Sequence, residues 1–239
     1  MKILYIFPHP DDESFGPALA MTAQMRAGHE VYLLTLTRGG ATKKRFKYNL
    51  TVDEMGEVRY REMLEVAKVL DLTGLTVLDL PDSGLKEMNP LELERIIERH
   101  IEKIRPDILV SYTVHGISGF HDHLVTHAVV KSAYCRIRQD QDATFLKRLA
   151  LFTVAESDVP DSKFKLNTSS PEEIDCIVAV DETDIEKSRQ ALLCYKTYQD
   201  VIEEVNVLER IGDKVFFEFF QEEYDPAAPD LTEGLPSGG

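Results

Sequence analysis

Short apolar runs alternate with amphipathic stretches along the first 136 residues of the chain. The continuous apolar runs have strand length, as expected for strands that are covered on both faces. Between them, apolar residues recur at the three- and four-residue spacing of helices. We expect strands at residues 3–7, 31–36, 76–80 and 108–112, and helices at residues 15–27, 54–70, 90–104 and 123–136.

This alternation predicts an α/β fold with a mostly parallel, doubly wound, Rossmann-like sheet, right-handed crossovers and helices on both faces. The pattern beyond residue 136 is less regular. It predicts strands at 149–155, 174–180 and 216–220, and a helix at 183–198 that Asp181 or Thr183 caps. Residues 1–225 are expected to form a single domain. Residues 226–239 are rich in Pro and Gly and are expected to be disordered.

Composition narrows the possible partners. The chain has 239 residues, and 42 acidic against 27 basic residues give a formal net charge of −15. Such a charge repels phosphate backbones and anionic lipids, so nucleic acid and membrane surfaces are not expected partners. No apolar run reaches the roughly 18 residues of a membrane span, and the start of the chain does not resemble a signal peptide. The three cysteines are widely spaced, which favours reduced thiols and a cytoplasmic location.

Residues that bind protons and metals are concentrated at two strand-to-helix junctions. The first junction is the stretch PHPDDE, which contains His9, Asp11 and Asp12, and the second is HGISGFHDH, which begins at His115. Four of the seven histidines of the chain lie in these two stretches. Because ligands bind beyond the carboxyl ends of parallel strands, we expect both junctions to face one crevice.

Two histidines and one carboxylate would suit a catalytic zinc that keeps one position open for water. The metal would lower the pKa of that water to about 7, and a neighbouring free carboxylate could take its proton. Two adjacent aspartates, Asp11 and Asp12, allow this division of labour. The same donor set also describes non-haem Fe(II) oxygenases. A third hypothesis is a non-enzymatic α/β protein that binds a metal.

Simpler explanations exist for some of these residues. Acids before a helix can cap its free N–H groups, although this does not explain His9 between two prolines. His127 is expected to face the core or to support a ligand rather than to bind metal, and His29 and His100 are expected to be structural. The basic stretch 43–47 could be a solvated loop or could steer an anionic substrate.

The motif HPDDE, together with a downstream junction that contains histidine, resembles the LmbE/PIG-L family of metal-dependent deacetylases. The segments TRGG, VRYRE and LPDSGL are similar to further motifs of this family, and YKTYQ is similar to a late family segment more weakly. The resemblance covers about two hundred residues. It implies removal of the acetyl group from an N-acetylglucosamine-type amino sugar or its conjugate.

The resemblance also implies a role for individual residues. His9, Asp12 and His123 would be the metal ligands, and Asp11 would be the general base. Zn²⁺ would be the cofactor, with Fe²⁺ as another possible divalent metal.

Three further roles follow from the same resemblance. Arg59 would contact the substrate, and Asp82 would bind a sugar hydroxyl. The family has a histidine at Phe120 that stabilises the oxyanion or protonates the leaving amine. His121, expected as a catalytic residue, or His115 could substitute for it. The expected partner is a small N-acetylated glycoconjugate, and related proteins often form homo-oligomers.

Overall fold

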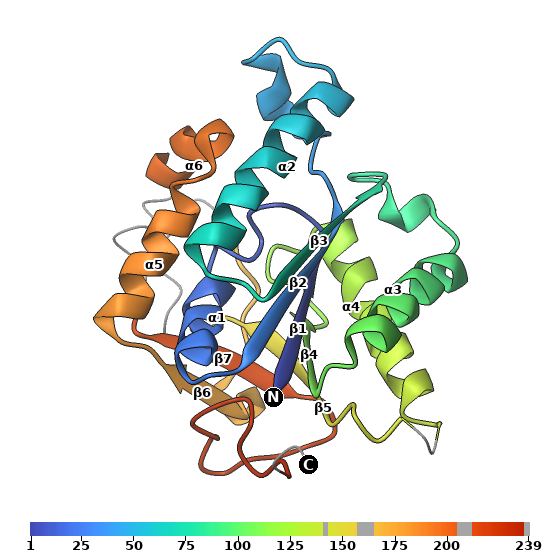
Figure 1. Ribbon diagram of the computed structural model, residues 1–239, viewed down its shortest axis with the longest axis vertical. Helices are drawn as coiled ribbons and strands as arrows, with labels where there is room; N and C mark the ends of the chain where they lie inside the picture. Colours follow the sequence, from blue (N-terminus) through green and yellow to red (C-terminus); the bar gives the residue numbers. More distant parts are fainter. Residues whose placement is uncertain (141–142, 157–164, 205–211, 237–239) are drawn as a thin grey trace.

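The computed structural model describes residues 1–140, 143–156, 165–204 and 212–236. In this part of the chain, seven strands form one sheet in the order β3-β2-β1-β4-β5-β7-β6 (Figure 1). Their bounds are β1 Lys2–Phe7, β2 Glu30–Thr37, β3 Gly74–Leu80, β4 Ile108–Tyr112, β5 Arg148–Thr153, β6 Cys176–Ala179 and β7 Lys214–Phe219.

The first five strands of the sheet are parallel. β1 pairs with β2 on one side, where Ile3 lies opposite Val31, and with β4 on the other, where Leu4 lies opposite Leu109. β7 runs antiparallel between β5 and β6. The predicted α/β fold with a mostly parallel sheet is confirmed.

Helices cover both faces of this sheet, as predicted (Figure 1). One face carries α1 Pro17–Arg26, α2 Val52–Val69 and α5 Glu182–Leu192, and the other carries α3 Pro90–Ile104 and α4 His121–Ile137. Two cores result, one for each face. Along β1, Tyr5 and Phe7 enter the first core, whereas Leu4 and Ile6 enter the second. This period of two explains why the strand reads as a continuous apolar run.

The helix predicted over residues 183–198 is shorter than expected. Asp181 caps α5 through the N–H groups of Thr183 and Asp184, but the helix ends at Leu192. A 3-10 turn, η5 Lys196–Tyr198, and the short helix α6 Gln199–Glu204 follow. The break allows Tyr195 to be fully buried and to donate a 2.6 Å hydrogen bond to Glu13. Sequence periodicity could not anticipate this long-range contact.

The prediction of a disordered tail is wrong for residues 226–236. Ala228 and Leu231 are each only 1% exposed. The fully buried Arg148 donates to the carbonyl of Leu231 and to the carboxylate of Glu222. A buried arginine needs such acceptors. Arg148 therefore holds residues 226–236 in place, although the composition of this segment predicts flexibility. Residues 237–239 lie outside the described residues.

No helix in the described part of the chain is both long and apolar enough to cross a membrane.

Candidate metal centre

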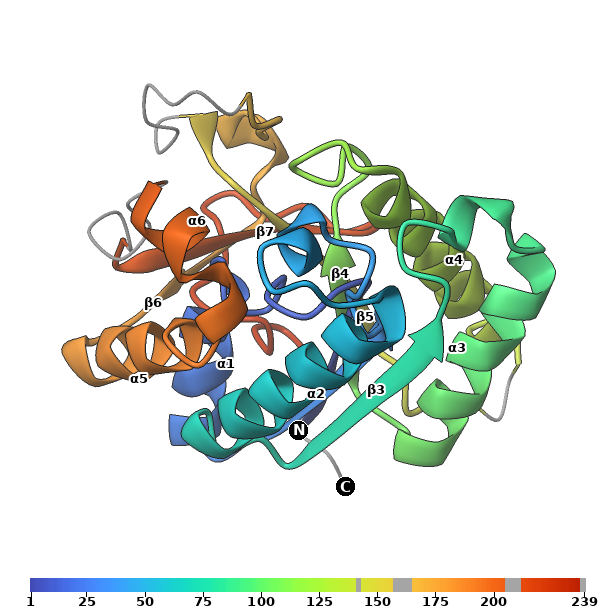
Figure 2. The ribbon, with the colours of Figure 1, turned by 90° about the horizontal axis from the view of Figure 1, so that it is seen from above.

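The two junctions meet at the carboxyl edge of the sheet. β1 and β4 are neighbours, and the connections that follow them lie side by side above this edge (Figure 2). Strand order also reverses here, because β2 and β3 lie on one side of β1 whereas β4 and β5 lie on the other. Such a switch point is where open α/β sheets bind ligands.

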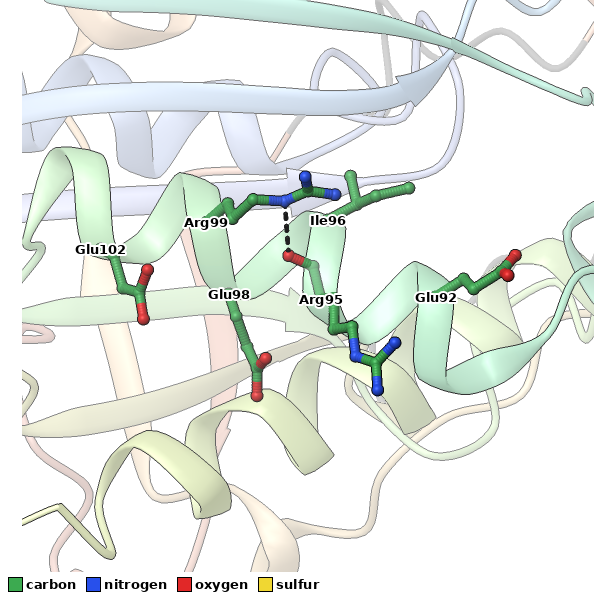
Figure 3. A pocket seen from close by; sticks show the side chains of 6 residues that line it. All are labelled: Glu92, Arg95, Ile96, Glu98, Arg99 and Glu102. Carbon is green, nitrogen blue, oxygen red and sulfur yellow. Dashed lines mark hydrogen bonds between the residues drawn. The ribbon is translucent and has the colours of Figure 1, made fainter.

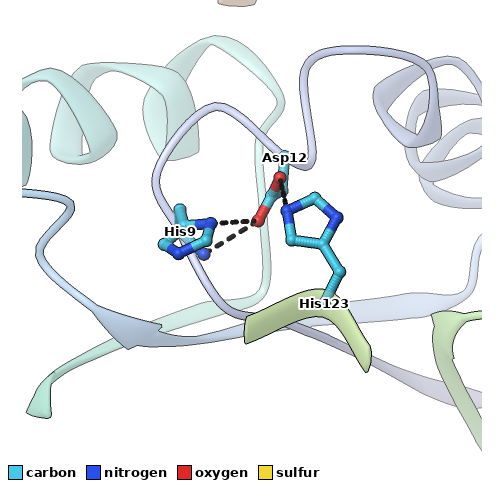
Figure 4. A group of neighbouring side chains, drawn as sticks. All are labelled: His9, Asp12 and His123. Carbon is cyan, nitrogen blue, oxygen red and sulfur yellow. Dashed lines mark hydrogen bonds and ion pairs between the residues drawn. The ribbon is translucent and has the colours of Figure 1, made fainter. Parts of the chain in front are cut away.

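The three predicted ligands lie together (Figure 4). The Asp12 carboxylate lies between two imidazoles, with Oδ2 3.4 Å from Nδ1 of His9 and Oδ1 3.3 Å from Nε2 of His123. Burial alone would raise the pKa of Asp12, but His123 and His9 outweigh burial and hold this pKa well below its usual range. Asp12 also accepts a 2.8 Å hydrogen bond from the Tyr112 hydroxyl.

Local contacts fix the His123 ring. Its Nδ1 lies 3.0 Å from the carbonyl of Gly116, so Nδ1 donates to that carbonyl and Nε2 is the ring nitrogen that faces Asp12. The ring stacks on Tyr112 at a centroid distance of 4.4 Å. Gly116 has a φ of +59°, and a Cβ there would lie 2.7 Å from the Cβ of His123. The glycine is therefore needed to bring its carbonyl against the ring.

His9 is held from its other side by two further carboxylates. Its Nε2 lies 3.1 Å from Asp122 and 3.3 Å from Asp82. Burial alone would lower the pKa of His9, but hydrogen bonds to Asp12 and Asp122 outweigh burial and raise it to about 10. A proton on Nε2 held by these acids leaves Nδ1 as the ring atom directed toward the Asp12 group.

Asp82 and Asp122 are themselves anchored by backbone N–H groups. Asp82 accepts from Ala41 at 2.6 Å, and Asp122 accepts from Ser83 at 2.8 Å. Asp82 therefore contacts His9 directly. We refer to His9, Asp12, His123, Asp82 and Asp122 together as the His9 group. Asp122 received no separate role from the sequence. Its position between two histidines at a helix start was the available signal.

The donor set suits a divalent cation. One ligand atom each from His9, Asp12 and His123 lie within 4.8 Å of one another, and a second such group joins His9, Asp82 and Asp122. Imidazole nitrogen and carboxylate oxygen are the donors that zinc and iron accept. Asp12, Asp82 and Asp122 in these groups and the neighbouring Asp11 bring four carboxylates together, which favours added positive charge. The residues present therefore fit a metal ion.

Asp11 lies beside this group but belongs to neither set of ligand atoms. Its φ of +85° places it in the left-handed region, which is unusual for a residue other than glycine. Arg59 donates to its carboxylate at 2.6 Å. Burial, aided by Asp12 and opposed by Arg59, raises the pKa of Asp11 to about 6.

Arg59 is placed differently from what the sequence suggested. It is only 2% exposed, and besides Asp11 it donates to the carbonyls of Pro10 and Gly39. Its guanidinium lies 4.2 Å from the centre of the Tyr198 ring. These contacts engage both Nη atoms, so the structure shows Arg59 supporting Asp11, and its expected contact with substrate stays a prediction.

The structure does not bring His121 into the group. His121 is exposed at the start of α4, and it makes no hydrogen bond or ion pair in the described part of the chain. His115 bonds instead with Thr113 and the N–H of Ile117. His127 is buried against the carbonyl of Tyr112, as expected of a supporting residue. Phe120 is 65% exposed, with its ring edge-on to His123 at 5.6 Å.

A hollow lies elsewhere, along the outer side of α3 (Figure 3). It is lined by Ile96 and by charged side chains of both signs: Glu92, Arg95, Glu98, Arg99 and Glu102. Alternating charges at helical spacing are typical of a solvated helix face. This hollow shares no residue with the His9 group.

Comparison with protein families decides the relationship. The family model described as GlcNAc-PI de-N-acetylase, PIG-L, matches residues 4–134, more than half of the chain. The chain belongs to the PIG-L family. The match includes both junctions and therefore every residue of the His9 group.

Curated PIG-L relatives carry deacetylase and amidase names. The probable N-acetyl-alpha-D-glucosaminyl L-malate deacetylase 2 of Bacillus anthracis is 29% identical over 146 residues, which are 60% of this chain and 63% of that protein. The mycothiol S-conjugate amidase of Streptomyces coelicolor is 29% identical over 152 residues, 56% of this chain and 52% of that protein. The chain thus matches between about half and two thirds of the length of these relatives.

Solved structures share the fold. The N,N'-diacetylchitobiose deacetylase of Pyrococcus horikoshii has a TM-score of 0.68 at 18% identity and covers 92% of this chain and 83% of its own. GalB, the 4-carboxy-2-hydroxymuconate hydratase of Pseudomonas putida, has a TM-score of 0.67 at 14% identity and covers 98% of this chain and 99% of its own. One fold thus carries both a deacetylase and a hydratase, so the fold alone does not fix the reaction.

Proposed function

We propose that this protein is a zinc-dependent deacetylase that hydrolyses the N-acetyl group of an N-acetylglucosamine-type sugar or its conjugate. One observation carries the proposal: His9, Asp12 and His123 converge on one point while Asp11, beside them, lies outside both groups of possible ligands. The names of the PIG-L relatives supply the substrate class.

His9, Asp12 and His123 would hold the metal. A bound zinc ion would polarise the acetyl carbonyl and make water a nucleophile near neutral pH. The hydrogen bond between Nδ1 of His123 and Gly116, that between His9 and Asp122, and the contact between His9 and Asp82 would keep both rings in the ligating tautomer and orientation.

Asp11 would transfer the protons. It would take one proton from the attacking water as the new carbon–oxygen bond forms. When the carbon–nitrogen bond breaks, the departing nitrogen must gain a proton. Phe120 has none to give, so we assign this second transfer to Asp11 as well. The products are acetate and the free amino sugar. Arg59 would hold the Asp11 carboxylate in place throughout.

The alternatives are less well supported. A non-haem Fe(II) oxygenase and a non-catalytic binding protein both remain compatible with the ligand geometry, but membership of the PIG-L family does not favour either. Zinc rather than iron, self-association and a cytoplasmic location stay predictions. Metal analysis of the purified protein and a test for oxygen dependence address the first of these.

A screen tests the function directly. Zinc-loaded protein is incubated with N-acetylglucosamine and a panel of its conjugates, and released amine is measured. Asp11→Asn should lower turnover on the order of 100-fold or more while zinc remains bound. The matched control, Asp53→Asn, changes an exposed acid of α2 and should not alter turnover. Near wild-type turnover in Asp11→Asn would remove the proposed base.

A further inference from the structure

One cationic segment lies at the carboxyl edge of an otherwise acidic protein. Residues 41–50, ATKKRFKYNL, contain four basic residues and no acidic one, although the chain as a whole carries a net charge of −15. Their centre is the 3-10 helix η1 Lys43–Phe46. This segment lies beyond the carboxyl ends of the central strands in Figure 1, and it overlies them in Figure 2, which is seen from above.

Hydrogen bonds tie this segment to the centre. The N–H of Ala41 donates at 2.6 Å to Asp82, and the other oxygen of Asp82 lies 3.3 Å from His9. The hydroxyl of Tyr198, whose ring lies against Arg59, donates at 2.7 Å to Thr42. The segment is therefore linked to His9 through Asp82, and to Asp11 through Tyr198 and Arg59.

Most of the positive charge of this segment is not neutralised within the described part of the chain. Lys44 and Lys47 share a single carboxylate, that of Asp200. Lys43 is exposed, and neither Lys43 nor Arg45 forms an ion pair there. Within the described residues, the four cations of this segment thus have one ion-paired carboxylate among them.

Arg45 is oriented in advance. Its Nη1 donates to the carbonyls of Ala41 and Thr42, each at 3.2 Å. Its guanidinium lies 4.0 Å from the centre of the Phe46 ring. These contacts leave its Nε and Nη2 without a protein partner in the described structure. A fixed guanidinium with free N–H groups matches the two oxygens of a carboxylate or phosphate.

We infer that residues 42–47 form a subsite for a negatively charged aglycone, with Arg45 as its direct contact and Lys43 as a supporting charge. The inference rests on the proposed function, because it assigns the substrate class of the same site. This subsite would select conjugates whose aglycone carries a carboxylate or a phosphate. Both groups present negatively charged oxygens to the subsite. The experiments below distinguish a carboxylate from a phosphate.

The first experiment compares substrates. Deacetylation kinetics are measured on N-acetylglucosamine conjugates with a carboxylate, a phosphate or a neutral aglycone. For Lys43→Gln/Arg45→Gln, KM for the preferred anionic conjugate should rise on the order of 10-fold more than KM for the neutral one, with kcat little changed. The control Lys103→Gln removes an exposed lysine from α3 and should change neither KM. Equal changes for charged and neutral conjugates would overturn the inference.

The second experiment does not depend on turnover. Malonate and inorganic phosphate are titrated into the protein, and amide chemical shifts are recorded by NMR. Saturable shifts at residues 42–47 that disappear in Lys43→Gln/Arg45→Gln would support the subsite. The anion that binds more tightly, malonate or phosphate, indicates whether the aglycone carries a carboxylate or a phosphate. The absence of saturable shifts would overturn the subsite even if neutral conjugates are deacetylated. Failure to deacetylate any conjugate, with anion binding intact, would instead count against the proposed function.

Discussion

Arg59 donates a 2.6 Å hydrogen bond to the carboxylate of Asp11, and the two residues are 48 positions apart in the chain. The same guanidinium donates to the carbonyl of Pro10 at 2.7 Å. One buried cation on α2 thus holds both the side chain of the proposed base and the loop that carries it. Arg59, itself buried, therefore supports Asp11 from within the protein.

This relationship predicts a specific kinetic effect for Arg59→Lys. A lysine keeps the charge but loses the fork that reaches Asp11 and two carbonyls together. We expect kcat to fall on the order of 10- to 100-fold with KM changed by no more than about twofold, because Arg59 positions Asp11. Steady-state kinetics with a sugar conjugate measure the two constants. A rise in KM at constant kcat would instead show that Arg59 binds substrate.

Substitution of two histidines of α4, His121 and His123, should have clearly different effects on zinc affinity and turnover. His123→Ala removes a proposed ligand and should lower zinc affinity on the order of 100-fold or more, with a matching loss of turnover in limiting zinc. His121→Ala, two positions earlier, should leave both within about twofold because its side chain is exposed. Zinc competition with a chromophoric chelator measures the affinity. Comparable losses in the two variants would contradict the ligand assignment.

Phe120 offers a gain-of-function test. It lies edge-on to His123 at 5.6 Å and is 65% exposed, so a ring at this position lies beside the proposed metal ligand. Phe120→His would add a group able to give a proton to the departing nitrogen. General acid catalysis is worth about 100-fold or more, and we expect kcat to rise at least severalfold. An unchanged or lower kcat, with zinc content intact, would mean that proton delivery does not limit the reaction.

The ordered tail depends on Arg148. This side chain is fully buried and bonds with Glu222, Tyr224 and the carbonyl of Leu231. Arg148→Met should lower the free energy of unfolding by roughly 3 kcal/mol, the lower end for broken buried pairs, since Glu222 remains partly exposed and can be hydrated. Arg99→Met on α3 should change it by less than about 0.5 kcal/mol. Urea unfolding of both variants measures the difference, and equal stabilities would contradict this role of Arg148.

Sequence patterns predicted the local features of this protein well. The helix at residues 90–104 and the strand at residues 108–112 have the expected bounds. A proline and a cap mark the start of the helix, and a buried apolar run marks the strand. The clustering of His9, Asp12 and His123 followed from one topological rule, that the ends of parallel strands share an edge.

Features that depend on distant contacts were not predicted. The helix break before Tyr195 exists because its hydroxyl reaches Glu13, 182 positions away. The order of the tail comes from Arg148, whose burial no local pattern reveals. Asp82 and Asp122 join the His9 group only because the loop after β3 and the start of α4 converge. In each case a polar side chain satisfies its hydrogen bonds across the fold.

The central claim is that His9, Asp12 and His123 bind one catalytic ion. Crystals grown with Zn²⁺ and measured on both sides of the zinc absorption edge test it most directly. The account predicts one strong anomalous peak about 2.0–2.2 Å from a nitrogen of each imidazole and an oxygen of Asp12, with Asp11 unligated. A peak held only by His9, Asp82 and Asp122, or no peak near these residues, would contradict it.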